Sequence, residues 1–251
     1  MTNKYFIPIV ALVFLMSCKQ EMHLTRIEGK RIEINDSLTG NQDIEDFIKP
    51  FREHVNNDLD SVLAYSVATY TKNDGELNTA IGNFMADAVK EMASPVFKTR
   101  TGNDIDIVML NHGGIRSILS KGDITSRTAY QIMPFENSVV ITGLKGTSVK
   151  EMVNYLQKAK RAHPISGMSI TLNADFELLE AKIKGEAIDD NKTYYVATND
   201  YLYNGGDNMS FFRQGDSLYK LDYKIRNVLI DYFKKVDTLN LNADDRFIKT
   251  N

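Results

Sequence analysis

The chain has 251 residues, of which 43% are hydrophobic and 25% are charged, with a formal net charge of −3. These values are typical of a globular protein with one large domain or two small ones. The chain has no excess of lysine and arginine, so the composition gives no indication of binding to a nucleic-acid polymer. A single nucleotide could still bind, because it needs only a few suitably placed residues.

The start of the chain has the layout of a secretory signal. Lys4 supplies a positive charge, an apolar run too short to span a bilayer occupies residues 6–16, and Ser17 precedes Cys18. This resembles a bacterial lipobox, which predicts a signal peptide at residues 1–17, a lipid-anchored Cys18, and a place in the cell envelope facing the periplasm or the cell surface. A plain signal peptide with a chance cysteine is the alternative. Because no other cysteine occurs, an intramolecular disulfide and a cysteine-based metal site are excluded.

The next elements lead into the main domain. A polar tether at residues 18–42 contains an alternating stretch at residues 25–34, which predicts a strand or a small hairpin. Apolar residues then recur at spacings of three or four, which predicts an amphipathic connector helix at residues 43–59. Pro50 lies inside that pattern and predicts a kink or a new helix start. The main domain is then expected at residues 60–251.

Strands and helices alternate along the main domain. Strands are predicted at residues 62–71, 105–110, 138–142, 168–172, 177–184 and 194–198, and helices at residues 78–92, 148–160 and 218–235. The run at residues 105–110 is almost continuously apolar, which is typical of a strand buried on both faces. Because the order follows no strict βαβ rhythm, we expect a mixed α/β (α+β) fold, in which helices pack on a mixed sheet.

The sequence Asn-His-Gly-Gly-Ile-Arg at residues 111–116 directly follows this buried strand. Gly113 and Gly114 let the backbone turn sharply and approach a ligand. Arg116 presents a planar fork of donors suited to phosphate or carboxylate. Since ligands of open α/β sheets bind beyond the carboxyl ends of strands, this loop is a candidate site. A glycine turn with a solvated arginine is the alternative.

Two further stretches carry residue types suited to a nucleoside. Phe135 follows a proline and could stack on a base, although a core phenylalanine at the start of a strand is the alternative. Tyr201 supplies a second ring, the pair Gly205 and Gly206 permits a tight loop, and the Asp207 carboxylate could accept two hydrogen bonds from a ribose diol. A tight loop without a ligand is the alternative for this stretch. Together with Arg116, these residues would form a nucleotide site.

The sequence offers no recognisable metal site or nucleophile. Its histidines are scattered, at His23, His54, His112 and His163. A two-metal phosphatase groups carboxylates, histidines and asparagines around its ions, and no Asp-x-His, Gly-Asn-His-Glu or Gly-Asn-His-Asp motif occurs. No Gly-x-Ser-x-Gly or Walker motif occurs either. We therefore expect no catalytic residue, metal or cofactor in this chain.

Several motifs, in order and spacing, resemble the C-terminal domain of 5′-nucleotidases. They are Asn-His-Gly-Gly-Ile-Arg at residues 111–116, Gly-Asp-Ile-Thr at 122–125, Pro-Phe-Glu-Asn at 134–137, Gly-Leu-Lys-Gly at 143–146 and Asn-Gly-Gly-Asp at 204–207. The resemblance extends over roughly residues 60–235, and residues 78–87 look like the family's helix opening around Gly-Asn.

In that family the C-terminal domain binds the base and the sugar, and a separate N-terminal metallophosphatase domain carries two metals and performs the hydrolysis. The resemblance implies that Phe135 and Tyr201 sandwich the base, that Asp207 holds the ribose hydroxyls and that Asn111 positions the nucleoside. It also implies that Arg116 meets a phosphate. Divalent metals are then expected only in a partner metallophosphatase.

One departure from the family concerns phosphate. Relatives place one or two arginines just before the Gly-Asn helix, whereas residues 73–77 of this chain read Asn-Asp-Gly-Glu-Leu. The exchange of basic for acidic residues weakens the expected grip on phosphate and leaves the expected binding of base and sugar intact.

Four hypotheses follow. The first is a split 5′-nucleotidase, in which this chain recognises a nucleoside or nucleotide and a separately encoded metallophosphatase hydrolyses it. The second is a non-enzymatic binding lipoprotein that captures nucleosides or nucleotides. The third is a hydrolase with metal ligands that no motif reveals, and the fourth is a structural lipoprotein. Whether the chain is itself an enzyme is left open among them.

Overall fold

The computed structural model describes residue 24 and residues 26–250 of the chain. These belong to two compact units, Met1–Lys49 and Pro50–Asn251. The predicted signal peptide and the predicted lipidation site, Cys18, lie outside the described residues and stay predictions. Among the helices that the structure does describe, none combines the length and the apolar character needed to cross a membrane.

The first unit contains an extended segment and the start of a helix. Residues 26–34 form no strand, so the prediction of a strand or small hairpin is wrong for this described stretch. Its isoleucine side chains stay exposed, because no neighbouring strand covers them. Helix α2 (Gln42–Asp60) is present where the apolar periodicity predicted one, and it continues through Pro50 without a new start. Its first turn is capped by Asn41, whose side-chain oxygen accepts a hydrogen bond from the backbone N–H of Asp43 at 2.9 Å.

The second unit is built around a five-stranded sheet. Its strands lie in the order β10 (Leu218–Lys224), β4 (Ser138–Lys145), β9 (Thr193–Asn199), β2 (Ile107–Met109) and β5 (Ile165–Ser166). β4 pairs with β9 antiparallel and β2 pairs with β9 parallel, so the sheet is mixed as predicted. β2 is buried along its whole length, as its apolar run indicated.

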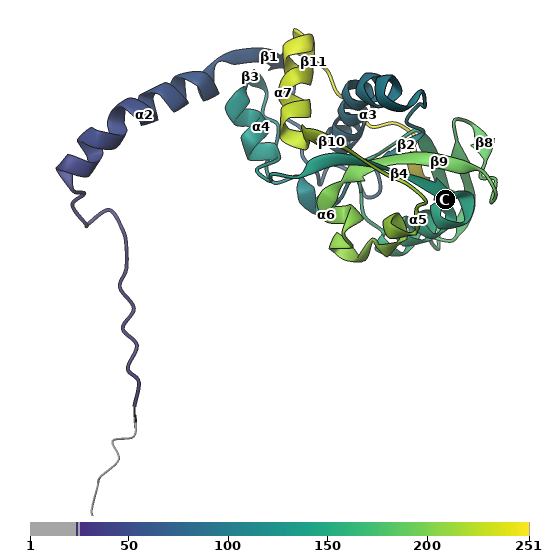
Figure 1. The fold of residues 1–251 in the computed structure, drawn as a ribbon, viewed down its shortest axis with the longest axis horizontal. Helices are drawn as coiled ribbons and strands as arrows, with labels where there is room; N and C mark the ends of the chain where they lie inside the picture. The colour runs from purple at the N-terminus through teal and green to yellow at the C-terminus, as the bar shows by residue number, and fades with distance from the viewer. Residues whose placement is uncertain (1–23, 25, 251) are drawn as a thin grey trace, which may run out of the picture. The chain divides into compact units, whose positions relative to one another are not determined.

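Helices cover both faces of this sheet (Figure 1). α3 (Ala80–Thr101) and α7 (Ile225–Lys235) pack together in one core, and α5 (Gly146–Ala159) packs in the other. Alternate residues of β2 reach these two cores, because successive side chains of a strand point to opposite faces. Val108 lies in the core with α3 and α7, and its two neighbours lie in the core with α5. The predicted fold class, a mixed sheet with packed helices, is therefore confirmed.

α3 extends beyond its predicted end at residue 92. It continues through Pro95 and ends at Gly102, whose left-handed φ of 77° forms the C-cap. The buried face of the helix continues in the same way, since Phe97 is fully buried and packs edge-on against the ring of Tyr195 at 5.3 Å. Tertiary packing therefore stabilises two further turns that the proline made unexpected.

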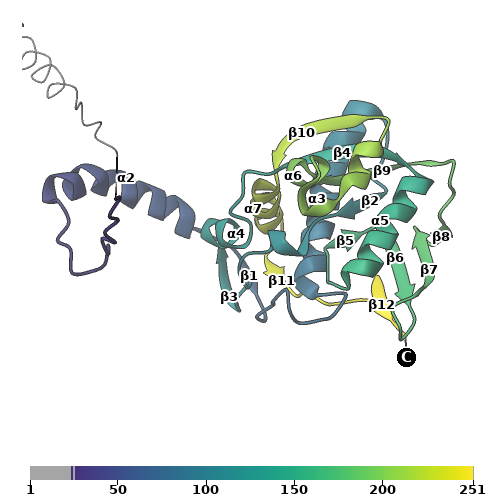
Figure 2. The same ribbon diagram turned by 90° about the horizontal axis from the view of Figure 1, so that it is seen from below.

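Two smaller sheets lie at opposite ends of the second unit (Figure 2). One contains β11 (Thr238–Leu239), β1 (Val62–Ser66) and β3 (Gly122–Thr125), and the other contains β12 (Phe247–Lys249), β6 (Met168–Leu172), β7 (Leu178–Ile183) and β8 (Glu186–Ala187). α4 (Ser126–Ile132) follows β3 directly and begins with a capping box between Thr125 and Thr128.

The prediction of one long helix at residues 218–235 is wrong, because the first part of this segment is strand β10 and only α7 is helical. β10 pairs antiparallel with β4, but its register shifts beyond Lys220, and Asp222 there has a φ of 55°. The side chains of β10 nevertheless alternate in burial, since Tyr219, Leu221 and Tyr223 pack in the core with α3 and α7 while Leu218 and Lys220 are exposed. Leu218 and Leu221 are three residues apart in the sequence, which is a spacing typical of a helix, although they lie on opposite faces of the strand.

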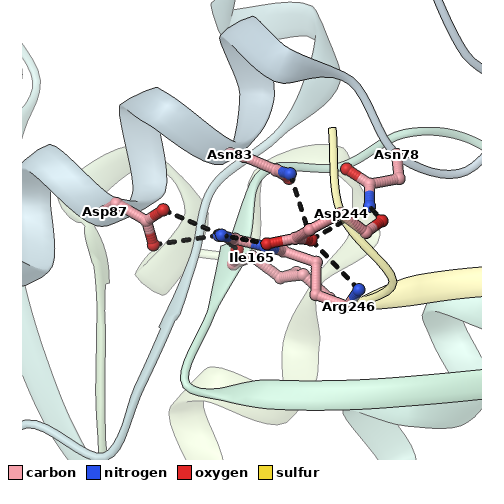
Figure 3. A network of polar contacts seen from close by, with 6 residues as sticks. All are labelled: Asn78, Asn83, Asp87, Ile165, Asp244 and Arg246. Carbon is pink, nitrogen blue, oxygen red and sulfur yellow. Dashed lines mark hydrogen bonds and ion pairs between the residues drawn. The ribbon is translucent and has the colours of Figure 1, made fainter. Parts of the chain in front are cut away.

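A network of polar contacts fastens the C-terminal segment to α3 (Figure 3). The guanidinium of Arg246 donates to both carboxylate oxygens of Asp87, at 2.9 and 2.8 Å, and to the carbonyl of Ile165 at 2.8 Å. It also donates to Asp244, at 2.7 Å from one of its terminal nitrogens. The contacts hold the chain where Phe247, fully buried, begins β12.

Candidate functional site

Three loops meet at one edge of the central sheet. β2 and β9 are parallel, so their carboxyl ends lie at the same edge, and β4 is antiparallel to β9, so its first residues lie there as well. The loops after β2, before β4 and after β9 enclose a cavity of about 580 Å³. Its lining residues are Asn111, Gly113, Gly114, Arg116, Met133, Phe135, Glu136, Asn137, Tyr201 and Asp207.

The structure brings together every side chain that the sequence predicted for substrate binding. Asn111, Arg116, Phe135, Tyr201 and Asp207 all line this cavity. Their expected roles toward a ligand stay predictions, but their common position around one cavity is a property of the fold.

The loop after β2 forms the 3₁₀ turn η1 (His112–Gly114). Gly114 is required here, because a Cβ at this position would lie 2.8 Å from the side-chain oxygen of Asn111. The ammonium of Lys72 donates to the carbonyl of Ile115 at 2.8 Å, and the backbone N–H of Arg116 donates to the carbonyl of Ile132 at 2.9 Å. These contacts fix the backbone of the loop.

Asp207 is held in place by contacts to both of its carboxylate oxygens. One accepts a hydrogen bond from the side-chain N–H of Asn111 at 2.7 Å, and the other accepts from the Tyr201 hydroxyl at 2.9 Å. The hydroxyl of Tyr155 donates to the Asp207 backbone carbonyl at 2.9 Å. An ionised carboxylate has about four lone-pair sites, so it can still accept hydrogen bonds from a ligand. The hydrogen bond to Asp207 and the charge of that carboxylate raise the pKa of Tyr201.

Gly205 and Gly206 do not line the cavity but shape the loop that carries Tyr201. α6 (Asp200–Tyr203) brings the tyrosine to the cavity, and Gly205, with a left-handed φ of 94°, turns the chain into η2 (Gly206–Asn208). A Cβ on Gly206 would lie 2.4 Å from the Tyr201 ring. Because Gly206 has no Cβ, the Tyr201 ring can pack directly against the backbone at this position.

The loop before β4 supplies an exposed ring beside paired charges. Phe135 is 41% exposed, and the guanidinium of Arg116 lies 5.7 Å from its ring centroid. Glu136 accepts a hydrogen bond from the buried Arg226 at 2.6 Å and pairs with Lys224 through its other oxygen. The charge of Glu136 is thus compensated, while Arg116 faces the cavity without a carboxylate partner in the described part of the chain.

Two histidines, His112 and His163, support the loop after β2. The backbone N–H of His112 donates to Nδ1 of His163 at 3.3 Å, and Nδ1 of His112 lies 3.1 Å from the carbonyl of Ala162. Burial, with the nearby His112 as the next cause, lowers the pKa of His163 from 6.5 to about 4. Burial also lowers the pKa of His112. Burial therefore favours the neutral form of both rings, and their contacts show that they support the loop after β2.

Sequence reasoning missed four residues of this site. Met133, Glu136 and Asn137 line the cavity, and Tyr155 contacts Asp207 from α5. The first three lie in the same short stretch as Phe135, and that proximity was the available signal. No pattern marks Tyr155, because its contact depends on how α5 packs. Over residues 24 and 26–250, no group of three or more histidine, cysteine, aspartate or glutamate side chains is placed to hold a metal ion.

Comparisons with known proteins identify the family to which this fold belongs. A sequence profile of the family described as 5′-nucleotidase, C-terminal domain, matches residues 58–214. The chain is 32% identical over 164 residues to the trifunctional nucleotide phosphoesterase protein YfkN of Bacillus subtilis (strain 168), covering 59% of this chain and 11% of YfkN. It is 30% identical over 157 residues to the cell wall protein Lmo0130 of Listeria monocytogenes, covering 57% of this chain and 19% of that protein.

The fold resembles that of the 5′-nucleotidase precursor from Thermus thermophilus, with a TM-score of 0.68 at 20% identity, over 82% of this chain and 43% of that chain. At this identity the likeness shows the fold alone. The matched region spans less than half the length of each of these proteins. The profile match covers most of the chain and includes every residue that lines the cavity. The chain therefore belongs to the family of 5′-nucleotidase C-terminal domains.

Proposed function

We propose that this chain is the substrate-recognition part of a 5′-nucleotidase-type hydrolase in nucleotide catabolism, and that it binds the nucleoside portion of a nucleotide. The observation that carries the proposal is the Asp207 carboxylate, which Asn111 and Tyr201 orient toward a cavity flanked by two accessible aromatic rings. A carboxylate held in this way suits a pair of neighbouring hydroxyl groups such as a ribose diol.

The rings would recognise the base. Phe135 and Tyr201 are 41% and 47% exposed, so both keep accessible surface for a planar ligand. Stacking of a base on an aromatic side chain contributes about 1–3 kcal/mol. Arg116, on the same cavity, is the cation available to a phosphate attached to the sugar.

Hydrolysis would be supplied by a metallophosphatase that acts with this domain, which we propose to be a separately encoded chain. That partner would hold the divalent metals and activate water, whereas this chain would contribute no catalytic residue. The sequence carries substrate-binding motifs without an Asp-x-His or Gly-Asn-His-Glu motif, which supports such a division of labour.

A non-enzymatic nucleoside-binding lipoprotein is the second candidate. The acidic residues at positions 73–77 favour it, because a nucleoside binder needs less positive charge than a nucleotide binder. This candidate predicts ligand binding of the same kind, without any gain of hydrolysis when a metallophosphatase is added.

We also propose a place in the cell envelope, through a lipid on Cys18. The layout of the first residues supports this proposal, as does the similarity to a cell wall protein. Labelling with a radioactive fatty acid in cells should mark the wild-type chain and leave Cys18→Ala unlabelled. Equal labelling of both proteins would contradict the anchor.

Calorimetric titration with adenosine, AMP and UMP tests the binding function. Phe135→Ala should weaken binding by about 1–3 kcal/mol, which is about 5-fold to 150-fold. Tyr65→Ala is a matched control, since Tyr65 has the same exposed fraction of 41% and lies away from the cavity on β1. Absence of binding by every nucleoside and nucleotide would refute the proposal.

Phosphate release from AMP separates the two candidates. The chain alone should release no phosphate, and addition of a separately expressed metallophosphatase domain of the family, loaded with Mn²⁺, should produce release that Phe135→Ala diminishes. Binding without any such gain would favour the non-enzymatic candidate.

A further inference from the structure

The two donors that hold the Asp207 carboxylate come from different segments of the chain and differ in exposure. Asn111 lies at the start of the loop after β2 and is buried, and its side-chain N–H donates to Oδ2 of Asp207. Tyr201 belongs to α6 and is exposed, and its hydroxyl donates to Oδ1. A carboxylate held at one oxygen alone can turn about that single hydrogen bond, whereas contacts at both oxygens fix its plane. The Tyr201 hydroxyl is the contact that fixes the exposed oxygen.

The backbone that carries Asp207 is held without the help of this hydroxyl. The hydroxyl of Tyr155, from α5, donates to the Asp207 carbonyl at 2.9 Å. The ring of Tyr201 packs against the backbone of Gly206, which has no Cβ to displace it. Removal of the Tyr201 hydroxyl alone would therefore free the carboxylate to turn and leave both the ring and the loop in place.

The hydroxyl of Tyr201 is a donor to this carboxylate at neutral pH. The hydrogen bond to Asp207, and then the negative charge of that carboxylate, raise the pKa of Tyr201 above its ordinary value. The phenol therefore keeps its proton and has it directed at Oδ1.

The arrangement leaves room for two further donors. An ionised carboxylate has about four lone-pair sites, and within the described part of the chain two side chains donate to this one, with one contact on each oxygen. One site therefore remains on Oδ1 and one on Oδ2. Gly113, which lines the cavity, leaves Oδ2 accessible, since even a Cβ at that position would lie 3.9 Å from this oxygen.

Two neighbouring hydroxyl groups on one sugar match these two sites, because each hydroxyl can donate to a different oxygen of the same carboxylate. A sugar that lacks one of the hydroxyls leaves one site without a donor from the ligand. Hydrogen bonds to a charged group are stronger than those between neutral groups, so the missing donor weakens binding appreciably. This discrimination depends on the plane of the carboxylate, since a carboxylate that can turn can satisfy a single hydroxyl equally well.

We propose that Tyr201 acts through its hydroxyl as a positioning residue that makes the cavity selective for ribonucleosides over deoxyribonucleosides. The hydroxyl holds the Asp207 carboxylate in the plane that meets both hydroxyl groups of the sugar. This role is separate from stacking of the Tyr201 ring on a base. The inference rests on the proposed binding of nucleosides and adds the class of sugar that the site selects.

The test compares the affinities of adenosine, 2′-deoxyadenosine and 3′-deoxyadenosine for the full-length protein by calorimetry. Adenosine should bind at least about tenfold more tightly than either deoxynucleoside, as expected for one hydrogen bond to a charged group. Tyr201→Phe, which keeps the ring, should lower this ratio by at least about threefold. Tyr203→Phe removes a hydroxyl from the same helix outside the cavity and should leave the ratio unchanged.

The ratio separates the hydroxyl from the ring and from the stability of the loop. Weaker stacking, or a displaced loop, would weaken the binding of adenosine and of both deoxynucleosides by the same factor, and a ratio equal in Tyr201→Phe and in the wild type overturns the proposal. Equal affinities of the wild type for adenosine and 2′-deoxyadenosine also overturn it. In both cases the binding of adenosine still upholds the proposed function, whereas a wild-type protein that binds none of these nucleosides would remove the proposed function itself.

Discussion

Protonation of His163 is expected to destabilise the fold at acidic pH. The residue is 7% exposed, and burial followed by the nearby His112 lowers its pKa from 6.5 to about 4. Its Nδ1 accepts the backbone N–H of His112 at 3.3 Å, and a protonated imidazole has no acceptor to offer. Acidification should therefore release the loop after β2 from its support.

The sign and the size of the effect follow from the two pKa values. Between pH 6.5 and about pH 4 the unfolded chain binds the proton more readily than the folded chain, so the free energy of unfolding falls as the pH falls. Above pH 6.5 the residue is neutral in both states and has no effect. The pKa difference from 6.5 to about 4, at about 1.4 kcal/mol for each pKa unit, corresponds to a total loss of about 3 kcal/mol in the free energy of unfolding.

Urea unfolding across this pH range, for the wild type and for His163→Gln, measures the effect. Glutamine can still accept the N–H of His112 but does not titrate, so the variant should lose about 3 kcal/mol less than the wild type on acidification. Carboxylates elsewhere contribute equally to both proteins and cancel in the difference. Identical pH profiles would refute the reasoning.

Two other substitutions test the packing of the molecule. Arg246→Ala should lower the free energy of unfolding, measured in urea, by about 2 kcal/mol, because it leaves Asp87 and Asp244 without their shared partner. The control is Lys182→Ala, which breaks an exposed ion pair and should lower the free energy of unfolding by less than about 1 kcal/mol. Gly206→Ala should weaken adenosine binding by about 1–3 kcal/mol with little loss of stability, because the new Cβ displaces the exposed Tyr201 ring. Calorimetry measures the binding and a thermal melt measures the stability, and unchanged binding would contradict the packing argument.

The elements that the sequence predicted well are those whose pattern matches the local environment. β2 was recognisable because it is covered on both faces and carries an unbroken apolar run. α5 was recognisable because one of its faces is buried and the other is solvated. In such elements, local spacing and tertiary burial carry the same information.

The elements that the sequence did not predict depend on distant partners. β12 has three residues, and it is a strand only because it pairs with β6 and because Arg246 anchors the preceding turn. β10 carries a bulge at Asp222 and is followed directly by α7, and the helical spacing of Leu218 and Leu221 obscured the alternation of its inward face, Tyr219, Leu221 and Tyr223. A short edge strand has too few residues for its own pattern to overrule such irregularities.

At the site, too, the sequence predicted which residues take part but not which of them contact one another. The motifs predicted five of the side chains that surround the cavity, namely Asn111, Arg116, Phe135, Tyr201 and Asp207, because their order and spacing resemble those of a known family. They did not predict that Asn111 and Tyr201 would share the Asp207 carboxylate, since that depends on where β2 and β9 end relative to one another. Pairing is a property of the assembled sheet edge.

Charge near the site depends on pairing in the same way. The composition of residues 73–77 suggests an acidic approach to the cavity, but Asp74 is hydrogen-bonded within its own turn and Glu76 is paired with Lys249. Lys72, directly before this stretch, reaches the loop after β2 and keeps its charge unpaired within the described residues. A ligand responds to the charges that remain unpaired after folding, because a paired charge is largely neutralised at a distance. The local field at this edge of the sheet is therefore more positive than the sequence of the segment indicates.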